Sequence, residues 1–166
     1  MELWRTLHPP LLRYLTVRRN ESPEDLAAET WLQVIRDLSS FEGSSREFRA
    51  FLFTVARNRA IDQGRARTAR PLVLVADPIE PPPSPSAETA ALEEISTRSA
   101  LDLVATLPAE QAEMVMLRVV AGLDVAAVAA IVGKKPGTVR VSVHRALRAL
   151  SRDPRIRSTG VQEEVV

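Results

Sequence analysis

The stretch Leu123–Leu150, LDVAAVAAIVGKKPGTVRVSVHRALRAL, constrains the fold of this chain more than any other. Apolar residues recur at helical spacing after Asp124, a residue type that caps helix N-termini, and Gly133 permits the backbone turn that ends such a helix. Pro136 and Gly137 then mark a short break before apolar and basic residues resume at helical spacing. The stretch therefore predicts two short helices joined by a tight turn.

The second of these helices is predicted to have one apolar and one basic side. At about 100° per residue, the two kinds of residue fall on opposite sides of the helix. The apolar side consists of Val139, Val143, Ala146 and Leu150, and the basic side of Arg140, His144 and Arg148. A helix of this kind, mounted on a preceding helix, fits the major groove of DNA. DNA is therefore the first candidate for a partner.

The candidate DNA contacts lie on this outer side and at the turn before it. They are Lys134, Lys135, Thr138, Arg140, Val141, His144, Arg145 and Arg148. Arginine can bond guanine bidentately, and Val141 is placed to meet a thymine methyl group. Lys134 and Lys135 at the turn are expected to hold phosphate rather than to read sequence. The alternative is a solvated basic face without a ligand.

Proline divides the 166-residue chain into two parts. Half of its 12 prolines fall in the stretch from Pro71 to Pro85, a composition typical of an extended, semi-rigid linker. Leu72–Val75 within it is either a short strand or part of the linker. We predict an all-α protein with two small helical domains, at 1–70 and 87–152, a flexible linker at 71–86 and a short tail at 153–166.

Charge is segregated along the chain, although the formal net charge is only +1. The Lys, Arg, Asp and Glu residues give +3 over residues 1–70, −5 over 71–106 and +3 over 107–166. Local basic patches steer nucleic acids even where the total charge is near zero. Both predicted domains therefore suit a nucleic-acid partner.

Composition argues against several other classes of protein. The chain has no cysteine, and its two histidines, His8 and His144, lie in separate domains, so no metal site is expected. It has no glycine-rich phosphate loop and no Ser or Cys nucleophile with a matched base, so neither an enzyme nor a cofactor is expected. No apolar run reaches the length of a membrane span, and no signal peptide is evident. We expect a cytoplasmic protein without membrane insertion.

Helices are also predicted in the rest of both domains. Ser22, Pro23 and two acidic residues form a helix start. The helix after it is expected to bury Ala27, Trp31, Val34, Ile35 and Leu38. Ser39–Arg46 is expected to be a loop, and a long helix to run from Glu47 or Phe48 to about Gly64, burying Phe48, Phe51, Leu52 and Val55. Ala87–Thr106 and Ala109–Ala121 are predicted as further helices.

Two blocks of this sequence resemble the extracytoplasmic-function (ECF) sigma factors, which are minimal specificity subunits of bacterial RNA polymerase. Residues 25–67 are similar to the family's acidic helix, loop and DNA-melting helix. Residues 107–150 are similar to its promoter-reading domain. A helix-turn-helix alone is shared by many regulators, but ETWLQV, FRAFLFTVARNRAID and LPAEQAEMVMLR together with GTVRVSVHRAL are specific to this family.

The resemblance implies a function in promoter recognition. The first domain would bind core RNA polymerase and capture the −10 element as it opens, and the second would read the −35 element. An anti-sigma factor is a further expected partner. For polymerase binding, the resemblance implies that one face of the acidic helix docks on the clamp helices of the largest subunit. The residues proposed for this contact are Asp25, Leu26, Glu29, Leu32, Gln33 and Arg36; the alternative is a solvated face with weak charge pairs.

The −10 contacts are expected on the helix that resembles the melting helix and on the loop before it. They are Phe41, Gly43, Phe53, Arg57 and Asn58. Phe53 lies about 140° from Phe48 around the helix, off the predicted buried side, and an exposed aromatic ring beside arginines suits stacking on unpaired bases. Asn58 can bond the edge of a flipped base, with Phe41 and Gly43 completing the pocket.

The chain departs from the family at two points. Asp124 is followed by Ala127, where the family often has Glu in a capping box. Val141 and Ser142 stand where the family often has Ser and Arg, so the promoter sequence is not predicted. A stand-alone helix-turn-helix regulator and a sigma-like adaptor that has lost DNA binding are the alternatives to a sigma factor.

Overall fold

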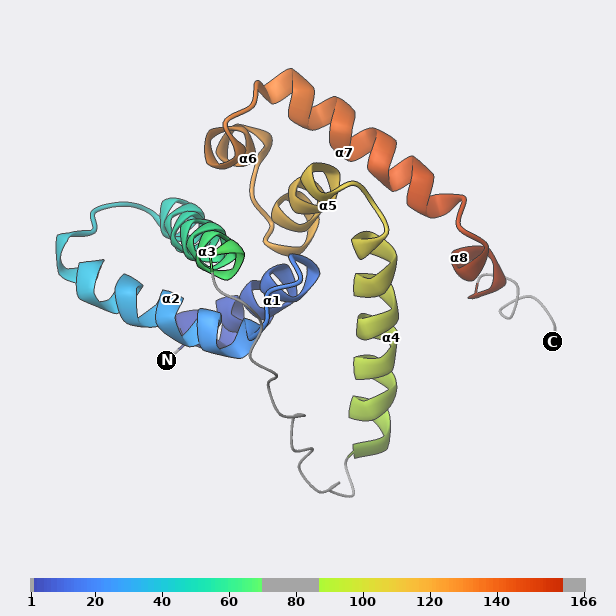
Figure 1. The fold of residues 1–166 in the computed structure, drawn as a ribbon, viewed down its shortest axis with the longest axis horizontal. Helices are drawn as coiled ribbons and strands as arrows, with labels where there is room; N and C mark the ends of the chain where they lie inside the picture. The colour runs from blue at the N-terminus through green and yellow to red at the C-terminus, as the bar shows by residue number, and fades with distance from the viewer. Residues whose placement is uncertain (1, 70–86, 160–166) are drawn as a thin grey trace.

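The computed structural model describes residues 2–69 and 87–159, and the regular structure in these ranges is entirely helical (Figure 1). The elements are α1 (Glu2–Val17), α2 (Pro23–Asp37), the short 3-10 helix η1 (Leu38–Ser40), α3 (Ser45–Thr68), α4 (Ala87–Ala105), α5 (Ala109–Val115), the π-helical segment η2 (Met116–Val120), α6 (Val125–Val132), α7 (Pro136–Ser151) and α8 (Pro154–Thr159). The predicted all-α fold is confirmed. The predicted linker, with Leu72–Val75, lies outside the described residues.

The start of α2 matches the prediction, but part of its predicted buried side is wrong. The helix begins at Pro23, and the hydroxyl of Ser22 donates to the carboxylate of Asp25 at 2.7 Å rather than accepting from the backbone. Ile35 and Leu38 were expected in the core, yet they are 61% and 48% exposed. Helix α2 packs against α1 and α3 on one side only, which leaves these two residues facing outward.

Helix α3 begins earlier than predicted because of a capping box. The hydroxyl oxygen of Ser44 accepts from the backbone N–H of Glu47, and the Glu47 carboxylate accepts from the backbone N–H of Ser44 at 2.7 Å. The backbone N–H of Ser44, together with its hydroxyl, which also donates to the Glu47 carboxylate at 2.8 Å, lowers the pKa of Glu47. The helix therefore starts at Ser45, inside the stretch expected to be a loop, and it continues to Thr68, beyond the predicted end.

The predicted helix-turn-helix is present. The Asp124 carboxylate accepts from the backbone N–H of Ala127 at 2.8 Å and so caps α6. Gly133 ends α6 in the left-handed conformation, with φ of 67°. The predicted helix at Ala109–Ala121 is instead α5 followed by the wider turn of η2, while α4 ends within one residue of its predicted end.

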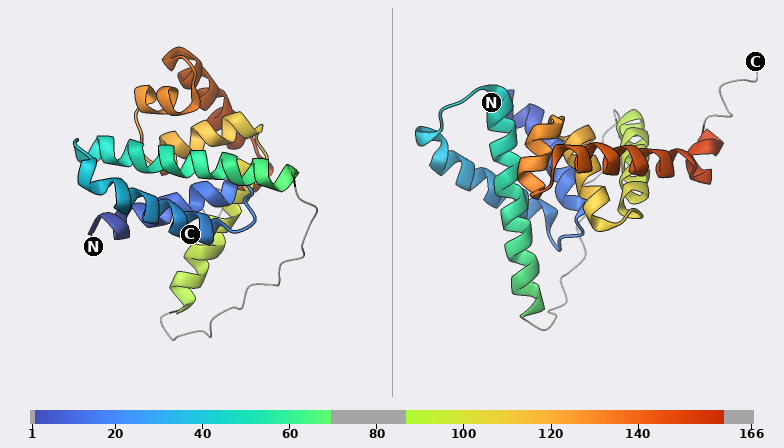
Figure 2. Two further views of the ribbon diagram at one scale, coloured as in Figure 1. Left: turned by 60° about the vertical axis from the view of Figure 1, so that its left-hand side comes forward. Right: turned by 90° about the horizontal axis from the view of Figure 1, so that it is seen from above.

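The two halves of the chain, residues 2–69 and 87–159, pack against each other. One hydrophobic core includes residues of both halves; α1 contacts α4, α5 and η2, and α3 contacts α6 (Figure 2). Arg46 pairs with Asp124 at 3.2 Å, and Arg49 donates to the carbonyl oxygen of Ala121 at 2.9 Å. A Cβ on the next residue, Gly122, would lie 2.8 Å from the Arg49 guanidinium. The backbone of the loop before α6 therefore approaches α3 closely.

The capping box predicts a stability effect at Ser44. Ser44→Ala removes the acceptor for the Glu47 N–H, and such losses cost about 1 kcal/mol. We expect the free energy of unfolding, measured by urea denaturation, to fall by this amount. Ser45→Ala, which leaves the capping box intact, is the matched control. Equal losses in both variants would contradict a role for the cap.

Candidate nucleic-acid and protein-binding surfaces

Helix α7 presents the predicted basic side outward. Pro136 occupies the first helical position, where its missing N–H costs no helical hydrogen bond. Val139 and Ala146 are fully buried, where α7 packs against α5 and α6. Val143 and Leu150 are partly buried, and Arg140, His144 and Arg148 are exposed. The sequence prediction of an amphipathic second helix is confirmed.

Most of the basic groups on this surface are open to a ligand. Within the described ranges, the side chains of Arg140, Arg145 and Arg148 take part in no ion pair. Lys134 pairs with Glu110 at 3.3 Å, on the side of the turn that faces α5. Lys135 and Thr138 are exposed, and Val141 is 48% exposed. The surface thus offers arginines, a lysine and an apolar side chain together, which suits contacts to phosphates and bases.

The outward face of α2 combines charged and aliphatic side chains. Asp25, Glu29 and Arg36 lie within about 40° of one another around the helix and are exposed. Leu32 on the same face is 55% exposed. The expected contact role of Leu26 is wrong for this structure, because Leu26 is 2% exposed. Leu26 lies about 100° from Asp25, on the side that faces the core.

Arg59 of α3 links two of the predicted polymerase contacts. Its Nη1 donates to the carboxylate of Glu29 at 3.0 Å, and its Nε donates to the side-chain oxygen of Gln33 at 3.1 Å. Gln33 is consequently half-buried at the edge of the α2 face. Arg59, which the sequence did not single out, therefore fixes the orientation of the α2 face relative to α3.

The predicted −10 residues do not form one pocket. Phe41 stacks on Phe51 with ring centres 5.4 Å apart and meets Phe48 edge-on at 5.5 Å. These contacts hold the loop that contains Gly43 against the start of α3. Asn58 lies ten residues beyond Phe48, about 15 Å along the helix, and lines a polar groove between α2 and α3. Asn58 and the loop are therefore separate features of the same half.

Phe53 is the −10 candidate whose expected exposure is wrong, and Arg57 is engaged in an ion pair with the other half. Phe53 is fully buried and meets the Tyr14 ring edge-on, with ring centres 5.6 Å apart. The Arg57 Nε donates to the Glu113 carboxylate at 2.8 Å. Helix α3 is covered on two sides, by α2 and by α1 with the C-terminal half, so a position 140° from Phe48 is also buried.

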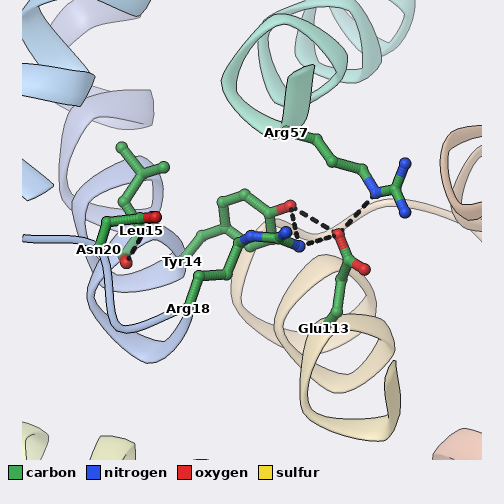
Figure 3. Close-up of polar contacts among 6 residues, drawn as sticks. All are labelled: Tyr14, Leu15, Arg18, Asn20, Arg57 and Glu113. Carbon is green, nitrogen blue, oxygen red and sulfur yellow. Dashed lines mark hydrogen bonds and ion pairs between the residues drawn. The ribbon is translucent and has the colours of Figure 1, made fainter. Parts of the chain in front are cut away.

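Glu113 of α5 receives three hydrogen bonds from the N-terminal half (Figure 3). The Tyr14 hydroxyl and the Arg57 Nε each donate to Oε1 at 2.8 Å, and the Arg18 Nη1 donates to the same oxygen. Glu113 is 8% exposed, whereas the side chains of Arg18 and Arg57 are 21% and 24% exposed. We call these four residues the Glu113 cluster. It joins α5 to both α1 and α3.

The Glu113 cluster keeps Tyr14 protonated. Burial and the nearby Glu113 carboxylate raise the pKa of Tyr14 far above its usual range, so its hydroxyl remains a donor. Sequence reasoning missed this cluster, because the three donors lie 56 to 99 residues before Glu113 in the chain. Glu113 stands out only as a charged residue in the otherwise apolar run AEMVML.

The described residues offer no metal-binding cluster of three or more His, Cys, Asp or Glu side chains. None of the helices in residues 2–69 and 87–159 is long and apolar enough to cross a membrane.

Two family models match the chain: sigma-70 region 2 over residues 3–70 and sigma-70 region 4 over residues 97–150. The ECF RNA polymerase sigma factor ShbA of Streptomyces griseus is 35% identical over 160 residues, which cover 90% of this chain and 84% of ShbA. The chain belongs to the ECF sigma factors. SigD of Mycobacterium tuberculosis is 36% identical, covering 90% of this chain and 74% of SigD. BldN of Streptomyces coelicolor is 35% identical, but only 53% of BldN is covered.

Solved structures agree with this assignment. The sigma factor RpoE of Bartonella quintana, in complex with the anti-sigma factor NepR, matches with a TM-score of 0.60 and 27% identity, covering 90% of this chain and 92% of that one. CnrH, in complex with the cytosolic domain of CnrY, has the same fold at a TM-score of 0.59 and 20% identity. This ECF sigma factor therefore directs promoter-specific transcription initiation, with RNA polymerase and promoter DNA as partners. A stand-alone regulator is not favoured.

Two glycines of the helix-turn-helix predict stability changes of opposite sign. A Cβ would meet nothing within 4 Å at either Gly133 or Gly137, so only the backbone matters. Gly133→Ala forces a left-handed conformation on alanine and should lower the free energy of unfolding by about 1 kcal/mol. Gly137→Ala, inside the first turn of α7, should leave stability unchanged or raise it slightly. Urea denaturation of both variants tests this, and a loss at Gly137 as large as that at Gly133 would contradict it.

Proposed function

We propose that the two halves of this ECF sigma factor divide promoter recognition between them. Residues 1–70 dock on core RNA polymerase and capture the −10 strand as it opens, residues 87–152 read the −35 element, and residues 71–86 connect them. The observation that carries this proposal is the exposed basic side of α7 on a capped helix-turn-helix, whose Arg140, Arg145 and Arg148 take part in no ion pair with the described residues. The factor works through binding and is not an enzyme: captured bases offset an unstacking cost of a few kcal/mol, and the polymerase supplies the chemistry.

For the polymerase contact, we assign the exposed face of α2 to the clamp helices of the largest subunit. Asp25, Glu29 and Arg36 lie beside Leu32 on this face, and Ile35, on the other side of Leu32, is 61% exposed. Aliphatic side chains within a charged rim are typical of a protein interface. Gln33 and Arg59 support the edge of this face, and Leu26 supports it from the core.

For the −10 element, we assign Asn58 and the loop that contains Phe41 and Gly43. The Asn58 side chain is exposed beside the α2–α3 groove and has both donors and an acceptor for a base edge. Gly43 lies against the Phe41 ring, because a Cβ on it would come within 3.0 Å of that ring. We infer an anti-sigma partner as well, since the sigma factor RpoE was solved with one.

The −35 assignment predicts a loss of affinity on substitution of Arg140. Selection from a randomised duplex pool first identifies the preferred −35 sequence. Arg140→Ala should then weaken binding to that duplex by about 1–3 kcal/mol, roughly 5- to 150-fold, and relax the preference at one base pair. Arg98→Ala, which removes an exposed arginine from α4, is the control and should bind as the parent does. If Arg140→Ala keeps the parental affinity for the duplex and the parental base preference, the assignment of α7 to the −35 element is wrong.

The polymerase assignment predicts a loss of capture on charge reversal. Asp25→Lys combined with Glu29→Lys should abolish pull-down by purified bacterial core RNA polymerase, because two charges of the α2 face change sign. Glu24→Lys is the control, since Glu24 is exposed but lies about 100° away from Asp25 around the helix. Retained capture of the double variant would refute docking through this face.

A further inference from the structure

The packed arrangement of the two halves cannot contact both promoter elements. Sites centred near −35 and −10 lie about 85 Å apart on B-form DNA, at 3.4 Å per base pair. A compact chain of 166 residues has a radius of gyration of about 15 Å and is about 40 Å across. The C-terminal half must therefore move away from α1 and α3 before both elements are bound. What holds the halves together in the free protein then controls access to the promoter.

We propose that Glu113 is an autoinhibitory contact that holds the free factor closed and keeps Arg57 from DNA. Each hydrogen bond to the Glu113 carboxylate comes from the other half: one from Tyr14 in α1, one from Arg18 directly after α1, and one from Arg57 in α3. The carboxylate thus has its partners only when the halves are packed. The statement about DNA rests on the proposed −10 role of the N-terminal half, whereas the statement about closure does not.

The Arg57 guanidinium has five donors, and one of them binds Glu113. Its Nε is committed to Glu113 in the closed arrangement, with the side chain 24% exposed. A guanidinium forms the same kind of charge-assisted hydrogen bond with a carboxylate as with a phosphate. Promoter DNA therefore competes with Glu113 for the Arg57 Nε, and separation of the halves leaves that donor available to a phosphate.

The energetics suit a reversible contact. A buried ion pair contributes little net free energy, because the desolvation of its charges offsets their attraction. Opening returns Glu113, Arg18 and Arg57 to water together, so no charge remains buried without a partner. Residues 70–86 number seventeen, and seventeen residues can span at most about 60 Å. The halves can therefore separate while they stay joined. Removal of one member alone should favour the open form, because it weakens the closed form specifically.

The experiment measures the distance between the halves in the absence of polymerase and DNA. The chain has no cysteine, so Ala66→Cys in α3 and Ala149→Cys in α7, both at exposed positions, give two unique spin-label sites in the full chain. Pulsed electron–electron double resonance should give one narrow distribution of spin–spin distances for this labelled parent. A broad distribution would overturn the proposal, because the free factor would not be closed.

Two variants test the Glu113 cluster from opposite sides. Glu113→Gln removes the charge in α5, and Arg18→Gln removes a donor directly after α1. Both variants should broaden the distribution toward longer distances. Arg13→Gln makes the same charge change on the exposed side of α1 and should leave it narrow. Because Arg18 and Glu113 lie in different halves, a folding defect in one variant leaves the other decisive. Narrow distributions in the folded variants would overturn the proposal.

Binding to core RNA polymerase tests the regulatory consequence. If only the open form binds fully, Glu113→Gln and Arg18→Gln should lower the apparent Kd for purified core enzyme by about threefold or more. An unchanged Kd with broadened distances would overturn autoinhibition. Failure of the parent and all variants to bind core enzyme would instead refute the proposed polymerase role, while the distance measurement would still decide whether Glu113 closes the protein.

Discussion

A buried carboxylate determines how the two halves of this sigma factor fit together. Glu113 can leave water only because Tyr14, Arg18 and Arg57 donate hydrogen bonds to its carboxylate, and these donors must approach from the C-terminal end of α1, the turn after it and α3 at once. That requirement fixes where α5 lies, and with it the position of the core that both halves share. Phe53 is buried as a consequence, since it packs beside Tyr14 beneath the same contact.

Closure covers some functional groups and leaves others accessible. The basic side of α7 and the charged face of α2 both point outward when the halves are packed, whereas Arg57 is held at the junction. A closed molecule could therefore meet the polymerase through α2 before its melting helix is fully exposed. The packing of the halves thus sets the order in which the α2 face and Arg57 become available to their partners.

Local rules in the sequence predicted what depends on near neighbours. Asp124 and Gly133 bound α6 as expected, and the apolar spacing from Val139 correctly gave the two sides of α7. The start of α3 is also a local feature, since Ser44 followed three residues later by Glu47 is the sequence pattern of a capping box. Phe53, Arg57 and Glu113 depend on contacts between residues far apart in sequence, which no spacing within one helix reveals. Exposure of Ile35 follows from the number of helices that cover α2, again a tertiary property.

The close approach of Gly122 to Arg49 has an evolutionary consequence. Any side chain at position 122 must shift the end of the Arg49 guanidinium, the atom that donates to the carbonyl oxygen of Ala121. The positive φ of Gly122 makes such a change unfavourable for the loop as well. A single substitution of Gly122 can therefore weaken the contact between α3 and the loop before α6 without altering any residue proposed to read DNA. Related factors could thereby diverge in how readily they become active while keeping the same set of target genes.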